Sequence, residues 1–134
     1  MTELPTFPVL TVRTGAARSF ESLEDISVTP TSGAKYYGDA VIFDSNIIEW
    51  RILMWRPLDA TNGLLRRVYL SISLRRRRYE LVWQKLGPRD IEYVKSKLLG
   101  EIRDEDEYYS EAGVSRRAIK RIKKIQDAIR LFGL

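Results

Sequence analysis

The chain has 134 residues, of which 44% are hydrophobic and 31% are charged, a composition typical of one globular domain and too apolar for a disordered chain. It contains no cysteine and no histidine, which excludes disulfides, thiolate nucleophiles, Cys-rich metal sites and the side chain that most often performs acid–base catalysis. The net charge is +5, but acidic residues gather at 101–111 and basic residues at 115–134, a segregation that usually reflects a partner or internal neutralisation.

Residues 1–8 contain two prolines and are predicted to form an extended lead-in. They show no basic segment followed by an apolar run, so we expect no signal peptide. No stretch approaches the roughly 18–20 consecutive apolar residues that a membrane span requires. We therefore expect a cytoplasmic protein, most simply a bacterial one, with no membrane partner.

Residues 1–86 are predicted to be mainly β. A short strand is expected at Val9–Arg13, because its residues alternate weakly between apolar and polar. Ser22 is a suitable N-cap for a helical turn over residues 23–26. The acidic residues in this turn lie where the helix dipole favours negative charge.

The strongest strand signal indicates a β-hairpin over residues 40–56. Its first strand is apolar, and Asp44-Ser45-Asn46 supplies turn residues whose short side chains bond their own backbone. Alternation in the second strand places Trp50 and Met54 on the core face, and Leu53 and Trp55 together on the opposite face.

Residues 67–74 also alternate, with apolar residues on one face and Tyr69, an arginine and two serines on the other. This pattern is typical of a half-buried strand in an antiparallel sheet. Residues 79–84 are apolar and aromatic enough to form a further strand, and Gly87-Pro88 breaks the pattern.

Residues 87–134 are predicted to be mainly helical. Apolar residues recur at steps of three and four over 89–103, and Ser115 is a good N-cap for a last helix over 115–132. The apolar stripe of that last helix comprises Ile119, Ile122, Ile125, Ile129 and Phe132. We therefore predict a single α+β domain over residues 1–134, with an antiparallel sheet of about four to six strands and one face packed by two C-terminal amphipathic helices.

No known catalytic, cofactor or metal motif fits the chain. A calcium loop beginning at Asp104 would need glycine at its sixth position and glutamate at its twelfth, where the chain has Tyr109 and Ser115. The pairs Tyr93–Lys97 and Ser32–Lys35 match catalytic spacings but lack the accompanying motifs. An enzymatic interpretation would rest on carboxylates near the hairpin: Asp39, Asp44 and Glu49.

We therefore expect no enzyme and no cofactor, but a protein that acts by protein–protein interaction, of a regulatory or toxin-neutralising type. Large apolar or aromatic groups outside the core suggest a covered or binding surface. The candidate protein-binding residues are Leu53, Trp55 and Tyr69. A homo-oligomer remains an open alternative.

The alternative hypothesis is a nucleic-acid-binding module. A basic helix face and the arginine run at residues 75–78 would attract phosphates, although the acidic residues 104–107 could neutralise the helix, and most basic helix faces are simply solvated. The residues concerned are Arg75, Arg77, Arg116, Arg117, Lys120, Lys123 and Lys124.

Overall fold

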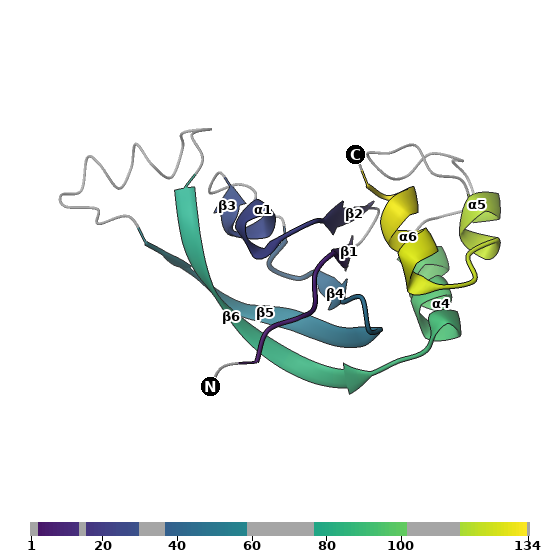
Figure 1. The fold of residues 1–134 in the computed structure, drawn as a ribbon, viewed down its shortest axis with the longest axis horizontal. Coiled ribbons are helices and arrows are strands. Elements are labelled where there is room, and N and C mark those ends of the chain that lie inside the picture. The colour runs from purple at the N-terminus through teal and green to yellow at the C-terminus, as the bar shows by residue number, and fades with distance from the viewer. Residues whose placement is uncertain (1–2, 14–15, 30–36, 59–76, 102–115, 134) are drawn as a thin grey trace.

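The computed structural model describes residues 3–13, 16–29, 37–58, 77–101 and 116–133, and within them it has an α+β fold (Figure 1). A curled antiparallel sheet has the strand order β2-β1-β4-β5-β6-β3. Its strands are β1 (Val9–Arg13), β2 (Ala16–Phe20), β3 (Val28–Thr29), β4 (Val41–Phe43), β5 (Ile48–Pro57) and β6 (Arg77–Pro88). The described helices are α1 (Leu23–Ser27), α4 (Ile91–Glu101), α5 (Arg116–Lys120) and α6 (Ile125–Leu131). None of these helices has the length and hydropathy that crossing a membrane would require.

Strand β1 lies inside the sheet and is buried on both faces. Leu10 and Val12 belong to one buried cluster and Val9 belongs to another, and all three side chains are at most 1% exposed. The hydroxyl of the intervening Thr11 is satisfied by donating to the carbonyl oxygen of Arg18 at 2.8 Å. Burial on both faces requires a layer on each side of the sheet, and the two clusters are those layers.

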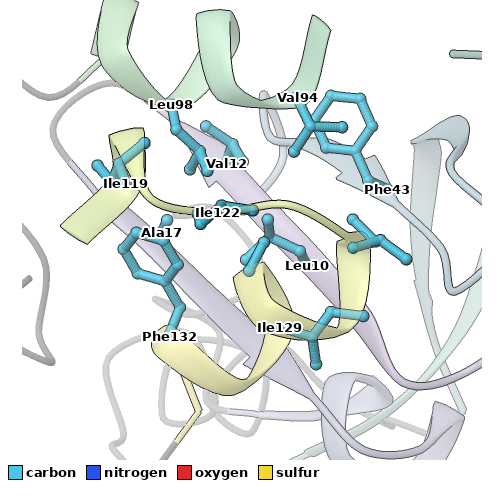
Figure 2. Close-up of a cluster of buried hydrophobic side chains, with 12 residues drawn as sticks. Leu10, Val12, Ala17, Phe43, Val94, Leu98, Ile119, Ile122, Ile129 and Phe132 are labelled. Carbon is cyan, nitrogen blue, oxygen red and sulfur yellow. The ribbon is translucent and has the colours of Figure 1, made fainter. Parts of the chain in front are cut away.

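The first cluster, which we call the C-terminal core, lies between the sheet and α4, α5 and α6 (Figure 2). It confirms the prediction that C-terminal helices cover one face of the sheet. All five residues of the predicted isoleucine and phenylalanine stripe belong to it. The buried members are Leu10, Val12, Ala17, Phe43, Val94, Leu98, Ile119, Ile122, Ile125, Ala128, Ile129 and Phe132.

The second cluster, which we call the tryptophan core, joins the strands to α1. Trp50 and Trp83 meet edge to face, with ring centroids 6.3 Å apart, and Ile26 reaches the cluster from α1. Ser22 caps α1 as predicted, because its hydroxyl accepts a hydrogen bond from the backbone N–H of Asp25 at 3.2 Å.

Several strand predictions are confirmed and two strands were not predicted. Strand Val9–Arg13 and the β4–β5 hairpin lie where the sequence places them, and β6 extends the strand predicted at residues 79–84. Strands β2 and β3 had no alternating signal, and pairing with β1 and β6 defines them. The strand predicted at residues 67–74 lies outside the described residues.

The prediction of one continuous last helix over residues 115–132 is wrong. The described chain forms α5, leaves the helix at Arg121–Lys124, and begins again as α6 at Ile125. In a straight helix, three isoleucines spaced by three residues would spread over about 120° of the circumference. In the interrupted chain, Ile119, Ile122 and Ile125 are all buried, with exposed fractions of 0%, 4% and 3%.

Gly87 supplies a backbone conformation that other residues rarely adopt. Its φ angle is +127°, and a β-carbon built there would meet only one Arg89 side-chain atom, at 3.9 Å. We therefore expect Gly87→Ala to lower the free energy of unfolding by about 1–3 kcal/mol through strain alone.

Gly100 in α4 has open space around it, so Gly100→Ala should raise stability by up to about 1 kcal/mol. Urea unfolding should show that the free energy of unfolding falls in Gly87→Ala and rises in Gly100→Ala. A change in the same direction for both variants would contradict the expected roles of the two glycines.

Candidate functional site

Strand β5 carries a bulge that determines which of its side chains face solvent. Ile52 pairs with Trp83 and Met54 pairs with Val82, so Leu53 is an extra residue that no residue of β6 opposes. One extra residue inverts the alternation of all side chains that follow it. Leu53 is 57% exposed and Met54 is 51% exposed, so two adjacent large apolar side chains face solvent.

This bulge corrects the prediction that Leu53 and Trp55 share an outer face. Trp55 is half-buried and packs against the tryptophan core, and its ring meets that of Tyr79 edge to face with centroids 5.7 Å apart. Met54, predicted to face the core, is exposed instead. Tyr69 lies outside the described residues.

The exposed apolar residues lie where β5 extends beyond its neighbour β4 (Figure 1). Strand β4 pairs with β5 only at Glu49 and Trp50, whereas β5 continues to Pro57. Within the described part of the chain, no strand pairs with that side of β5 beyond Trp50. A strand edge of this kind presents backbone groups to which another chain can pair.

Two arginines and a further leucine frame the exposed pair on β5. Arg56 lies opposite Glu80 and its guanidinium is 3.7 Å from that carboxylate, but both side chains are more than half exposed, so the pair adds little stability. We use the name β5 shoulder for the exposed residues Arg51, Leu53, Met54, Arg56 and Leu58. Sequence reasoning missed Met54 and Leu58. The signal available was the run of four apolar residues at 52–55, which no strict alternation explains.

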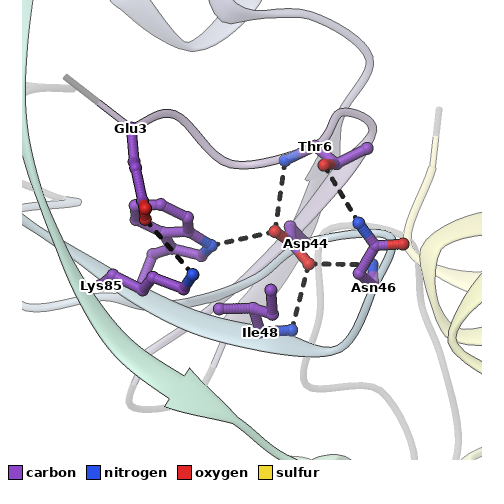
Figure 3. Close-up of polar contacts among 7 residues, drawn as sticks. Glu3, Thr6, Asp44, Asn46, Ile48 and Lys85 are labelled. Carbon is purple, nitrogen blue, oxygen red and sulfur yellow. Dashed lines mark hydrogen bonds and ion pairs between the residues drawn. The ribbon is translucent and has the colours of Figure 1, made fainter. Parts of the chain in front are cut away.

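Asp44 is a buried carboxylate whose two oxygens are fully engaged (Figure 3). Oδ1 accepts from the backbone N–H groups of Asn46 at 2.8 Å and Ile48 at 3.0 Å. Oδ2 accepts from the backbone N–H of Thr6 at 3.2 Å and from Nε1 of Trp50 at 3.0 Å. This carboxylate therefore organises the β4–β5 turn and ties the N-terminal segment to it.

Glu49 is also committed to a structural contact. Its side chain is 8% exposed, and its Oε1 accepts from Nε of Arg89 at 3.1 Å. This hydrogen bond raises the pKa of Arg89 above its ordinary value, against the lowering effect of burial, and Tyr93 adds to the rise. A group whose pKa is raised in the folded state contributes stability while it is protonated, and that contribution is lost when the pH rises above the raised pKa. Because arginine stays protonated throughout the range in which proteins fold, the pair carries no pH switch.

The described carboxylates do not form a metal-binding group. Among the residues that the structure describes, no three acidic side chains come together in a way that could hold a metal ion. Asp39 is exposed, while Asp44 and Glu49 make the bonds given above. The acidic residues 104–107 lie outside the described residues.

Five of the basic residues near the C-terminus form a second candidate surface. They occupy α5 and the interruption before α6, and all are exposed. Among the described residues, none of their charged side-chain groups forms an ion pair, although the backbone N–H of Lys123 donates to Oδ2 of Asp127 at 3.4 Å. We use the name basic surface for Arg117, Lys120, Arg121, Lys123 and Lys124.

The other predicted basic residues do not extend this surface. Arg75 lies outside the described residues, and the side chains of Arg77 and Arg116 are not described, although their backbones belong to β6 and α5. Arg78 lies 3.5 Å from Glu24 in an exposed ion pair. Figure 1 shows that the start of β6 and α5 lie at opposite ends of the molecule, so the described residues do not join the two basic segments into one face.

A hollow adjoins the basic surface between α4 and α5. Its volume is about 350 Å³, and Glu92, Lys95, Ser96, Leu99 and Lys120 line it. Nζ of Lys95 lies 3.9 Å from the Glu92 carboxylate, and the side chains are 16% and 79% exposed, respectively. Two lysines from different helices thus face one open hollow.

No protein-family model, no curated protein and no solved structure matches this chain.

Proposed function

We propose that this protein acts without catalysis, by binding another protein at the β5 shoulder. The observation that carries the proposal is the bulge at Leu53. It exposes Leu53 and Met54 side by side on a strand whose outer edge has no described strand paired to it. Exposed adjacent apolar groups and an open strand edge together are features of a protein-binding surface.

The proposed partner contributes an extended segment that adds to the sheet along β5. Main-chain hydrogen bonds would supply affinity in this mode, and alternate side chains would supply specificity. Arg51 and Arg56 frame the apolar pair, so the segment that fits best is apolar at its centre and acidic at its flanks. The protein would act through this binding alone, for example by regulating its partner or by neutralising a toxin.

A protective interpretation of the same edge also deserves a test. Charged residues and proline at a strand edge discourage aggregation, and β5 has Arg51, Arg56 and Pro57 there. That interpretation accounts for the arginines but not for two exposed apolar side chains between them. The experiment below separates the two interpretations.

The direct test compares proteins captured from the native cells by the wild type and by Leu53→Glu/Met54→Glu. Buried apolar anchors at interfaces contribute about 1–4 kcal/mol each, so the double variant should retain about one tenth or less of the specific partner. Binding should also slow amide hydrogen exchange over residues 51–57. Leu86→Glu is the control, because Leu86 is 39% exposed and lies four residues beyond Val82, the partner of Met54, about 13 Å along β6.

Three results would overturn the proposal. The first is a wild-type capture that the double variant reproduces in full. The second is an equal loss with Leu86→Glu, which would indicate general adhesion. The third is a wild-type dimer, detected by light scattering, that the double variant dissociates, because the shoulder would then be occupied by a second copy of this chain.

A further inference from the structure

Cations occupy every position between the three buried isoleucines of the interrupted C-terminal end. Ile119, Ile122 and Ile125 are all buried in the C-terminal core. The residues between them are Lys120, Arg121, Lys123 and Lys124, and all four are exposed. Core packing therefore directs every intervening cation to solvent, and Arg117 adds a fifth exposed cation from the preceding turn.

We propose that the basic surface and the α4–α5 hollow bind the phosphate backbone of a nucleic acid. Lys120 belongs to both features, and Lys95 approaches the hollow from the other helix. Lysine and arginine side chains that neutralise phosphates release condensed counterions, and this release supplies most sequence-independent affinity. Five cations without described ion-pair partners provide that chemistry. The inference does not depend on the partner proposed for the β5 shoulder, which lies at the other end of the molecule (Figure 1).

The composition of the surface favours nucleic acid over a membrane or an acidic protein. An interfacial membrane helix inserts its apolar side into the bilayer, but here the isoleucines of α5 and α6 face the C-terminal core. Protein interfaces centre on apolar and aromatic residues. The exposed large hydrophobic residues of the described chain all lie at or before Tyr93, and none lies on the basic surface.

Binding at this surface should have little sequence preference. Lysine and arginine contacts to phosphates position a protein on nucleic acid, whereas contacts to base edges specify sequence. The hollow accommodates part of the sugar-phosphate backbone between Lys95 and Lys120. The negative charge of Glu92 at its rim disfavours close approach of a phosphate on one side. The footprint is short, because the arginines at the start of β6 lie at the opposite end of the molecule.

The test measures fluorescence anisotropy of fluorescein-labelled 20-base-pair DNA and 20-nucleotide single-stranded RNA with the full chain. If about four phosphates are contacted, affinity for the duplex should fall about 100-fold between 50 and 200 mM salt. Lys120→Glu/Lys123→Glu should weaken binding at 50 mM salt by about tenfold or more and reduce the salt slope by about 2. Lys95→Gln should weaken binding by a smaller factor, since it neutralises one wall of the hollow.

The matched control is Arg78→Glu/Lys85→Glu, which changes the net charge by the same amount away from the basic surface. Both of its residues are exposed, with side-chain fractions of 62% and 43%, and it should retain binding within about threefold. The proposal is overturned if neither probe binds at 20 mM salt, or if the control loses as much affinity as Lys120→Glu/Lys123→Glu. Binding to vesicles of anionic lipid with no binding to either nucleic acid would assign the surface to membranes instead. Circular dichroism of each variant establishes that the fold is intact before binding is compared.

Discussion

Replacement of Asp44 with asparagine should destabilise the protein by about 3 kcal/mol, although the two side chains have nearly the same shape. Each carboxylate oxygen of Asp44 accepts two hydrogen bonds, so all four contacts come from donors. An asparagine offers one oxygen and one NH₂ group. One pair of donors would therefore face another donor, and a buried donor left unsatisfied costs about 1–3 kcal/mol.

Urea unfolding of Asp44→Asn, with Asp39→Asn as the control, measures this effect. Asp39 lies five residues earlier and is exposed, so its substitution should change stability by less than about 0.5 kcal/mol. Hydrogen exchange should also accelerate near Thr6, because the Asp44 turn ties this part of the N-terminal segment to the sheet. Stability of Asp44→Asn equal to that of the wild type would show that the buried carboxylate does not organise the turn.

Truncation of Phe132 should cost about 3–5 kcal/mol, the largest effect that we expect from a single core substitution. Phe132 is 1% exposed in the C-terminal core. Its carbonyl oxygen accepts from the N–H of Ser19 at 3.2 Å, and the hydroxyl of Ser19 donates to the carbonyl oxygen of Ile129. These backbone contacts hold the end of α6 against β2, and the buried ring packs beside them in the C-terminal core.

Phe132→Ala isolates packing, because residue 132 follows α6 and its substitution changes no helix interior. Phe132→Leu should cost less, since it leaves a smaller cavity. Leu131→Ala removes a half-buried neighbour and should cost about 1 kcal/mol. Thermal and urea unfolding of the three variants should give that order. A loss below about 1 kcal/mol for Phe132→Ala would mean that α6 is not docked on the sheet.

The sequence predicted those elements that depend on neighbouring residues. Ser22 caps α1 because its side chain reaches an N–H three residues later. Asp44 begins a turn because it bonds the backbone at residues 46 and 48. The alternation around Trp50 and the isoleucine stripe also identified core residues correctly. Each of these signals involves residues that are close together in the sequence, so it can be recognised without the tertiary structure.

The candidate binding surfaces needed the tertiary structure. A bulge is a relation between two strands, so the extra residue at Leu53 is visible only where β5 is paired with β6. The pairing places Trp55 inward and Met54 outward, whereas the apolar run at residues 52–55 indicates only that the alternation is irregular.

The basic end of the chain shows the same division. Its isoleucines and lysines follow from the sequence, and their spacing alone predicts one helix with a basic face. The tertiary structure instead interrupts this helix before Ile125, with Ile119, Ile122 and Ile125 all buried in the C-terminal core. The sequence by itself thus determined the α+β fold class, the turn and cap residues and the apolar stripe. Only the tertiary structure decided which side chains are exposed, because exposure depends on what each element packs against.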